Sequence, residues 1–192
     1  PNGIDMSKWD HILTRIANPK GEVNIALVGK YMGIGDTYKS IDESLQHAGI
    51  HNHVKVNTHW VDASGFEHEN LTQKLGKMDG VLVPGGFGER GVEGKLAAIR
   101  FAREQHIPYF GICYGMQLAM IEIARHVLGL KTAASTEFKP FDNSLEHGPL
   151  VGLMTEWDRH GAKERREADG DLGGTMRLGA YPCTLEKNTH AY

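Results

Sequence analysis

The sequence predicts an α/β domain of three layers, in which helices cover both faces of a doubly wound, mostly parallel β-sheet. Short apolar runs typical of buried strands alternate with segments whose apolar residues recur at helical spacing. Such alternation indicates parallel strands joined by right-handed crossovers. One predicted strand also ends at a cysteine between two glycines, and a helix is expected from the next residue. That arrangement is typical of a nucleophile elbow.

The first predicted elements follow a short leading segment. Residues 1–21 contain a weak helical pattern and then Asn-Pro and glycine, so we expect an interdomain linker with one or two helical turns. The domain is expected over 22–192. It opens with an apolar strand at 23–28. A helix follows, for which Asp36 is positioned as the cap and Gly49 as the end.

The next elements continue the alternation. Residues 54–61 alternate between apolar and polar and predict a strand near the sheet edge. Helices are expected around 71–78 and at 92–105, with a buried strand at 81–83 between them. The strand at 107–112 then ends at the cysteine, and a helix continues through 118–130.

The pattern changes after that helix. A strand is expected at 150–154, and strand-like residues return at 176–180. Between them, the charged and glycine-rich stretch 158–174 has little apolar content, so we expect a mobile flap there.

Composition bounds the class of protein. The 192 residues are 40% hydrophobic and 23% charged, as in one soluble globular domain. The net charge of −3 favours neither nucleic acid nor a membrane as partner, and no apolar run could span a bilayer. Two cysteines without a secretory signal indicate a cytoplasmic protein. Because the chain begins at Pro1 rather than Met, we expect a piece of a longer protein.

The central motif is IPYFGICYGMQ over 107–117, in which Gly111 and Gly115 flank Cys113 at two residues on either side. A side chain at either glycine would collide with the neighbouring strand or helix. The helix N-terminus would favour the thiolate. Cys113 is alternatively a small buried core residue, which is the commoner role of a free cysteine. The two glycines in register favour the nucleophile.

A second glycine-rich turn follows the strand at 81–83. Gly86, Gly88 and Gly91 match G-x-G-x-x-G, but the next strand ends in Cys113 rather than in an acidic residue for a ribose. We therefore expect the turn to lie beside the elbow. The N–H groups of Gly86 and Tyr114 would then face a developing oxyanion, as acyl transfer requires. A tight turn without a ligand stays open.

Other patterns are weaker. Lys30, Lys77 and Lys95 each follow glycine, but no Ser or Thr completes a phosphate-binding loop. Three clustered histidines lack an acid or cysteine at metal-ligand spacing, so we interpret them as surface residues: His51, His53 and His59. Cys183 has no flanking glycines, and a packing role is expected.

Five segments together carry a resemblance: ALVGKY at 26–31, VPGGFGERGVEGK at 83–95, GICYGMQLA at 111–119, STEF at 135–138 and GGTMRLG at 173–179. This set resembles the C-terminal glutaminase domain of CTP synthases, a class I (triad-type) glutamine amidotransferase domain, over nearly the whole chain. The resemblance implies a flavodoxin-like fold and a ligase that makes CTP from UTP with ammonia from glutamine. It implies ATP and Mg²⁺ in a separate N-terminal synthetase domain, no cofactor in this domain, GTP as effector and a homotetrameric parent.

The resemblance also implies residue roles. Cys113 is expected to attack the glutamine amide and form a glutamyl thioester, with Gly86 and Tyr114 as oxyanion donors. Gly115, Met116 and Gln117 would line the glutamine pocket together with these residues. Glu137 would bind the α-ammonium group of glutamine, although a solvated loop carboxylate is the alternative. The segment with Arg165, Arg166 and Gly174 is similar to a lid that responds to GTP.

Two positions depart from the family. Tyr114 stands where leucine is usual, which retains the N–H but is expected to change the pocket wall. The family's His-Pro-Glu motif is absent, and none of the eleven histidines has an acidic residue two positions later. We therefore expect a chain truncated at its C-terminal end and inactive alone. Two alternatives stay open: a degenerate regulatory domain, or another elbow-cysteine hydrolase that uses His147 or His160.

Overall fold

A computed structural model describes residues 4–30, 36–66, 71–86, 88–138, 149–153, 156–159, 162–165 and 182–189. The chain divides into two compact units, Pro1–Gly152 and Leu153–Tyr192. The predicted sheet and the predicted elbow both lie in the first unit, so this unit positions the candidate site.

The first unit contains a four-stranded parallel sheet with the strand order β2-β1-β3-β4. The strands are β1 (Glu22–Gly29), β2 (Lys55–Asp62), β3 (Gly80–Val83) and β4 (Tyr109–Gly111). This order confirms the predicted parallel sheet and places β2 at an edge, as its alternating sequence indicates. It also makes β3 and β4 neighbours, which brings the two glycine-containing turns together.

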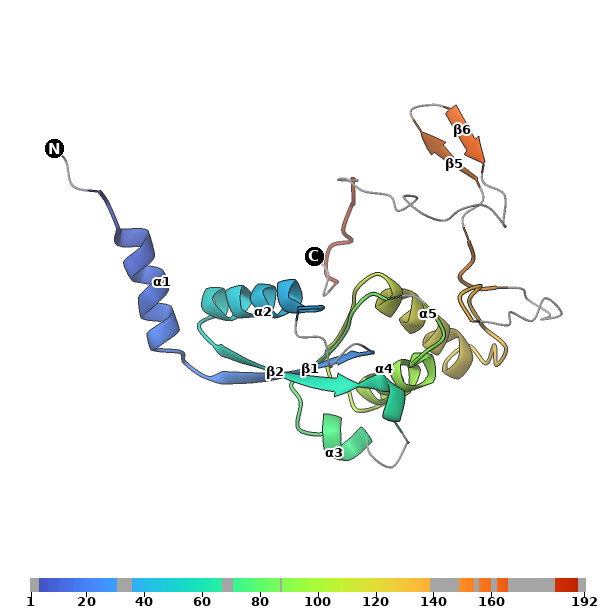
Figure 1. The fold of residues 1–192 in the computed structure, drawn as a ribbon, viewed down its shortest axis with the longest axis horizontal. Coiled ribbons are helices and arrows are strands. Elements are labelled where there is room, and N and C mark those ends of the chain that lie inside the picture. Colours follow the sequence, from blue (N-terminus) through green and yellow to red (C-terminus); the bar gives the residue numbers. More distant parts are fainter. Residues whose placement is uncertain are drawn as a thin grey trace. The chain divides into compact units, whose positions relative to one another are not determined.

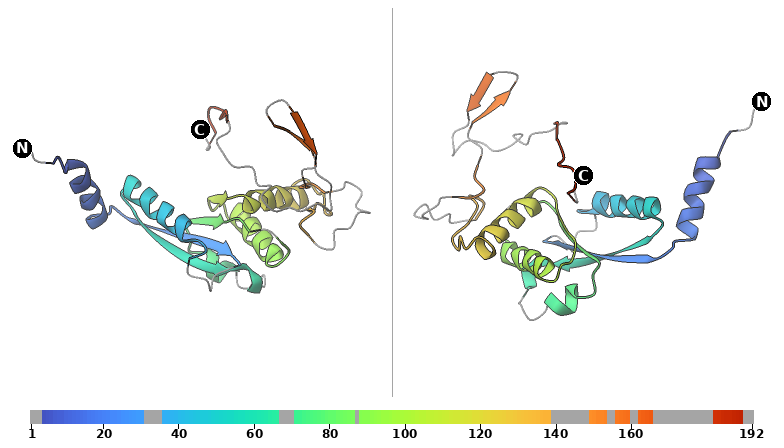
Figure 2. Two further views of the ribbon diagram at one scale, coloured as in Figure 1. Left: turned by 45° about the horizontal axis from the view of Figure 1, so that its top comes forward. Right: turned by 180° about the vertical axis from the view of Figure 1, so that it is seen from behind.

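Helices cover both faces of this sheet, which confirms the doubly wound, three-layer prediction (Figures 1 and 2). The helical elements are α1 (Ser7–Ala17), α2 (Lys39–Asn52), the short 3-10 helix η1 (Ala63–Gly65), α3 (Leu71–Leu75), α4 (Val92–Glu104) and α5 (Tyr114–His126). None of the helices in the described ranges is long and apolar enough to cross a membrane.

The two faces of the sheet hold separate apolar clusters, because successive strand residues point in opposite directions. Leu27 and Leu82 pack with Tyr38 beneath α2. The larger cluster lies on the opposite face, where Ala26, Val28, Val81 and Val83 pack against α3, α4 and α5. The elbow helix α5 therefore rests on the main core of the unit.

Two predicted helix boundaries are wrong. The residue at the start of α2 is Tyr38, without a side-chain cap, and Asp36 contributes only its carbonyl oxygen to Lys39 N–H at 3.4 Å. The helix also continues past Gly49 to a left-handed cap at His53. A Cβ at Gly49 would lie 2.7 Å from Val54 O, so this glycine permits close packing rather than ending the helix. In the leading segment, α1 has 11 residues, more than the expected one or two turns.

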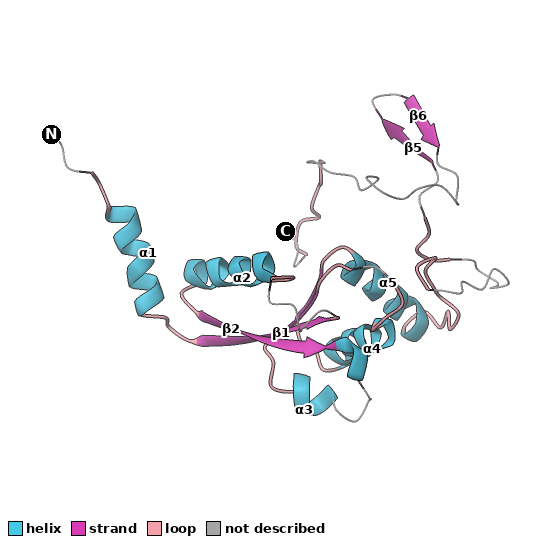
Figure 3. Cartoon of the chain, viewed as in Figure 1, coloured by secondary structure: helices cyan, strands magenta, loops and turns pink. Residues whose placement is uncertain are grey.

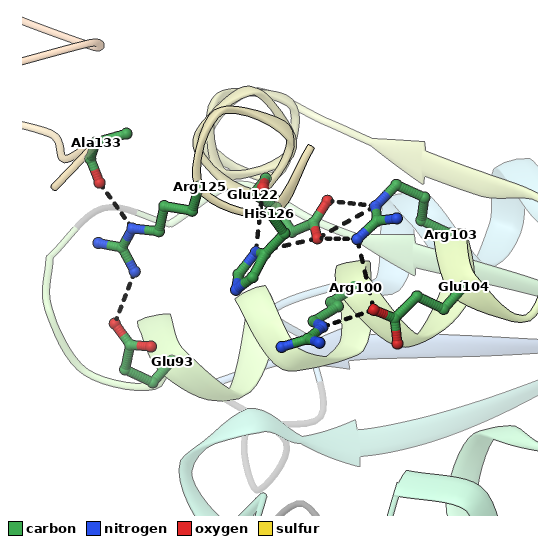
Figure 4. Close-up of polar contacts among 8 residues, drawn as sticks. All are labelled: Glu93, Arg100, Arg103, Glu104, Glu122, Arg125, His126 and Ala133. Carbon is green, nitrogen blue, oxygen red and sulfur yellow. Dashed lines mark hydrogen bonds and ion pairs between the residues drawn. The ribbon is translucent and has the colours of Figure 1, made fainter. Parts of the chain in front are cut away.

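A buried carboxylate joins α4 to α5 (Figure 4). Glu122 is fully buried and accepts hydrogen bonds from Arg103 Nε, at 2.9 Å and 3.3 Å, and from Arg103 Nη2, at 2.8 Å. His126 Nδ1 lies 3.2 Å from Glu122 Oε1. These hydrogen bonds to Glu122 raise the pKa of Arg103. The pair fixes the elbow helix against its neighbour.

The second unit contains an antiparallel hairpin formed by β5 (Glu156–Arg159) and β6 (Ala162–Arg165) (Figure 3). Within the predicted strand at 150–154, Val151 forms an isolated bridge with Ser135, and Met154 lies outside the described residues. The predicted flap at 158–174 begins inside this hairpin. Residues 166–181, which include the expected strand-like segment at 176–180, lie outside the described residues.

Candidate active site

Cys113 lies at the turn between β4 and α5, where it is the N-cap residue of α5. Its backbone angles of φ 55° and ψ −113° lie in a region that non-glycine residues rarely adopt. The side chain is exposed, so the interpretation of Cys113 as a buried core residue is wrong. A strained backbone that presents a sulfur to solvent is the geometry of a nucleophile elbow.

The flanking glycines are required by sterics, as the sequence predicts. A Cβ at Gly111 would lie 2.6 Å from the carbonyl carbon of Gly115 and from Met116 N. A Cβ at Gly115 would lie 2.0 Å from Val83 O on the neighbouring strand. The hydroxyl of Tyr109 donates a hydrogen bond of 2.8 Å to Gly115 O, which ties β4 to the start of α5.

The glycine-rich turn after β3 lies directly beside the cysteine. Val83 pairs with Gly111 across the sheet, and Ile112 N–H donates to Val83 O at 3.0 Å. A Cβ at Gly85 would lie 3.3 Å from Cys113 Cβ and 3.7 Å from its Sγ. Gly86 follows with φ 121°, and its N–H has no hydrogen-bond partner among the described residues. The turn thus has a backbone N–H without a described partner one residue after the glycine that lies against Cys113.

The side chain of Tyr114 points into the core beneath the elbow, where it is fully buried. Burial, with a smaller contribution from Glu137, raises the pKa of its hydroxyl to about 12. The change of the pocket wall that the sequence analysis expects from Tyr114 stays a prediction, while its ring lies in the core. The tyrosine changes the packing under the elbow and leaves its backbone N–H at the start of α5.

The remaining predicted pocket residues lie along the start of α5 and in the following loop. Gly115 is buried, Gln117 is half-buried and Met116 is 54% exposed. Glu137 is half-buried, and its N–H donates to Ser135 Oγ at 3.1 Å. The charge of Glu137 contributes to the raised pKa of the Tyr114 hydroxyl.

Several other residues that the sequence analysis singled out are not part of this site or lie outside the described residues. His59 hydrogen-bonds to Asn24 Oδ1 at 3.0 Å, and the described residues bring together no group of three His, Cys, Asp or Glu for a metal. Cys183 is exposed, so its predicted packing role is wrong. Of the lid residues, Arg165 ends β6, while Arg166 and Gly174 are outside the described residues, as are His147 and His160.

A hollow of about 160 Å³ lies on the outer side of α4 and α5, away from the elbow. Glu93, Arg100, Arg125 and His126 are among its lining residues. None of the predicted catalytic or glutamine-binding residues lines it, so it is distinct from the candidate site.

Sequence reasoning missed two buried lysines near the elbow. Lys30, at the end of β1, is 6% exposed, and Lys95, in the first turns of α4, is 1% exposed. Lys95 Nζ lies 5.6 Å from the centroid of the Tyr114 ring. The signal was present in the sequence, because Lys95 follows Val92 by three residues and precedes Ile99 by four, on the apolar face of the helix.

The fold and the site define an α/β domain with a cysteine nucleophile elbow. The family model for class-I glutamine amidotransferases matches residues 34–192. The chain belongs to the class-I glutamine amidotransferase family.

Among curated proteins, the chain is 56% identical over 185 residues to the CTP synthase of Paramagnetospirillum magneticum, covering 96% of this chain and 33% of that protein. It is also 56% identical over 185 residues to the CTP synthase of Zymomonas mobilis, covering 95% of this chain and 33% of that protein. The chain thus spans about a third of the length of these relatives.

A solved structure gives the same fold. The glutaminase domain of Trypanosoma brucei CTPS with bound acivicin superposes with a TM-score of 0.58 at 42% sequence identity. The superposition covers 65% of this chain and 47% of that chain.

Proposed function

We propose that this chain is the glutaminase part of a CTP synthase and that Cys113 is its nucleophile. The observation that carries the proposal is the elbow itself. Cys113 has a strained backbone and an exposed sulfur at the N-terminus of α5, with the turn at Gly85 packed against it. Similarity to CTP synthases supports the choice of glutamine as substrate.

The proposed reaction begins when the Cys113 thiolate attacks the carboxamide carbon of glutamine. The carbonyl oxygen becomes an oxyanion, which the N–H groups of Gly86 and Tyr114 stabilise. The intermediate collapses with cleavage of the C–N bond, and the amide nitrogen takes up the proton that the Cys113 thiol gave up and leaves as ammonia. Water then attacks the thioester, releasing glutamate and restoring the thiol.

The remaining groups at the elbow would bind the amino acid. We propose that the Glu137 carboxylate pairs with the α-ammonium group of glutamine, since a cation in a partly buried site needs an anion. Gly115, Met116 and Gln117 line the pocket along the first turn of α5. The half-buried position of Glu137 in the loop after α5 supports this arrangement.

At the level of the parent protein, we propose that the ammonia aminates UTP to CTP in an N-terminal synthetase domain that uses ATP and Mg²⁺. GTP as effector, a homotetrameric assembly and a cytoplasmic location belong to the same proposal. So does the division into a linker at 1–21 and an amidotransferase domain over 22–192. The similarity to CTP synthases three times the length of this chain supports it.

The test is mass spectrometry of the chain after exposure to an electrophilic glutamine analogue. Iodoacetamide, which alkylates any accessible thiol, is the comparison reagent. Cys113 and Cys183 are both exposed and free, so Cys183 is an internal control for simple thiol reactivity. We expect the analogue to modify Cys113 and leave Cys183 unmodified, and iodoacetamide to modify both. Free glutamine should protect Cys113 alone.

Labelling of both cysteines by iodoacetamide, without selective labelling by the analogue, would contradict the proposed glutamine pocket and favour a degenerate regulatory domain.

A second measurement is the rate at which the chain turns over glutamine. Among the described residues no hydrogen bond joins a histidine to Cys113, and the chain has no histidine with an acid two positions later. We therefore expect the isolated chain to be labelled at Cys113 but to release ammonia from glutamine slowly.

A further inference from the structure

Lys95 is buried in a way that costs stability. Its side chain is 1% exposed, and among the described residues its ammonium group makes no hydrogen bond and no ion pair. Its one described partner is the face of the Tyr114 ring, with Nζ 5.6 Å from the ring centroid. A buried ammonium without a carboxylate is unfavourable for folding, so a contribution to stability does not explain why a lysine occupies this position.

The environment of Lys95 contains a second cation. Lys30, 6% exposed at the end of β1, repels it, and burial together with this repulsion lowers the pKa of Lys95 to about 8. The other described groups that titrate or carry charge here are Tyr114 on α5 and Glu137, which acts on Tyr114. At neutral pH Lys95 therefore remains protonated and attracted to the Tyr114 ring.

Tyr114 links this cation to the elbow. It is the first residue of α5, it follows Cys113 directly, and its ring lies wholly in the core. The position of the ring therefore constrains the backbone that carries the Tyr114 N–H. We propose that Lys95 is a positioning residue of the elbow, which holds Tyr114 by a buried cation–π contact so that its N–H faces the reacting carbonyl. The function of that N–H as an oxyanion donor rests on the proposed glutaminase activity.

The first experiment does not depend on that activity. In the full chain with Cys113→Ser, which removes the neighbouring thiol, the backbone amide resonance of Tyr114 is followed by ¹⁵N NMR from about pH 6.5 to 9.5. We expect the resonance to shift with a midpoint near 8, the pKa of Lys95, and Lys95→Met to abolish that transition. An unchanged transition in Lys95→Met would overturn the proposal.

The matched control is Lys74→Met. Lys74 Nζ lies 5.2 Å from the Phe66 ring centroid, so this variant removes a comparable contact from an exposed site on α3. It should leave the Tyr114 transition and the reactivity of Cys113 unchanged. An equal effect of the control on Tyr114 would show a non-specific loss of positive charge and contradict the proposal.

The second experiment measures function and stability together, with Cys113 intact. At pH 7 we expect Lys95→Met to slow labelling of Cys113 by the glutamine analogue about tenfold, while labelling by iodoacetamide changes less than about twofold. Thermal unfolding should occur at an equal or higher temperature, because a buried charge has been removed. A parallel loss of stability and of both labelling rates would show a merely structural role and overturn the proposal.

Two further variants separate the contact from the charge. In a Tyr114→Leu background, Lys95→Met should cause no additional loss, since the ring is already absent. Lys95→Arg should keep the labelling rate at pH 7 but lose the transition near pH 8, because a guanidinium stays charged. If the unmodified chain is not labelled by the analogue, the proposed glutaminase fails, and the NMR titration alone decides the role of Lys95.

Discussion

The α-carbons of Gly111 and Gly115 face backbone atoms that leave no room for a methyl group. For Gly115 the obstacle is Val83 O on β3, which also accepts a hydrogen bond from Ile112 N–H. The strand, the cysteine and the helix are therefore locked at a separation that only glycine permits. At the residue scale, the exposed sulfur depends on these two contacts more than on the chemistry of Cys113 itself.

We expect Gly115→Ala to destabilise the chain by about 2–3 kcal/mol, because the added Cβ forces α5 away from β3. Selective labelling of Cys113 by the glutamine analogue should be lost as the elbow moves. Denaturant unfolding and labelling mass spectrometry measure the two effects. Gly21→Ala is the control, because a Cβ there meets nothing within 4 Å. A Gly115→Ala protein with wild-type stability would contradict the described packing.

Residue identity and spacing predicted the elbow, while the other residues of the proposed site stay predictions. The spacing of Gly111, Cys113 and Gly115 predicted the elbow, because its steric demand is local and appears in the sequence. The contact of Gly85 with Cys113 and the position of Lys95 beneath Tyr114 depend on strand register and helix rotation. Those relations join residues far apart in the chain, so sequence spacing gave only a partial indication of them.

At the scale of elements, α4 and α5 are joined by the bidentate pair of Arg103 and Glu122 (Figure 4). The two partners differ in exposure, since Glu122 is fully buried and the Arg103 side chain is 35% exposed. Breaking the pair from the arginine side therefore leaves a carboxylate in the interior. The orientation of the elbow helix depends on keeping that carboxylate paired.

We expect Arg103→Met to destabilise the chain by about 3 kcal/mol, since among the described residues it leaves buried Glu122 with His126 as its one remaining charged partner. The double variant Arg103→Met with Glu122→Leu should recover most of the loss, because no buried charge remains. Urea unfolding measures both. Arg100→Met breaks the exposed pair with Glu104 and should cost less than about 1 kcal/mol. A double variant as unstable as the single one would refute this account.

Element types were predictable where the apolar periodicity was strong, and boundaries were not. The four strands predicted at 23–28, 54–61, 81–83 and 107–112 are present in the parallel sheet, because apolar runs of this length are typical of buried strands. The ends of α2 were misplaced because tertiary packing of Gly49 against Val54 and a left-handed His53 override local capping signals. The hairpin β5–β6 was missed because its residues are charged and form no apolar pattern.

At the scale of the whole molecule, stability should depend on pH through Lys95. The pKa of this lysine is about 8 in the folded chain, below its ordinary value of 10.5. Below pH 8 both folded and unfolded chains are protonated there, and the cost of burying the charge is present in full. Between pH 8 and 10.5 the unfolded chain binds more protons, so stability rises with pH.

We expect the free energy of unfolding of the wild type, relative to Lys95→Met, to be constant from pH 6 to 7 and to rise from pH 8 to 10. Burial raises the pKa values of Tyr109 and Tyr114. Above pH 10 these tyrosines ionise in the unfolded chain before they ionise in the folded chain, so they lower the free energy of unfolding there. Measurements therefore stop at pH 10. A difference that falls over this range would have the wrong sign for a buried ammonium.

The backbone angles of Cys113 also bear on how this chain responds to selection for stability alone. Glycine adopts such angles without steric cost, so replacing Cys113 with glycine would relieve strain of about 1 kcal/mol or more. A screen for heat or protease resistance alone would therefore enrich variants that have lost Cys113. Stabilising this chain for practical use requires an assay that also measures the reactive thiol, because the most stable variants would lack the proposed nucleophile.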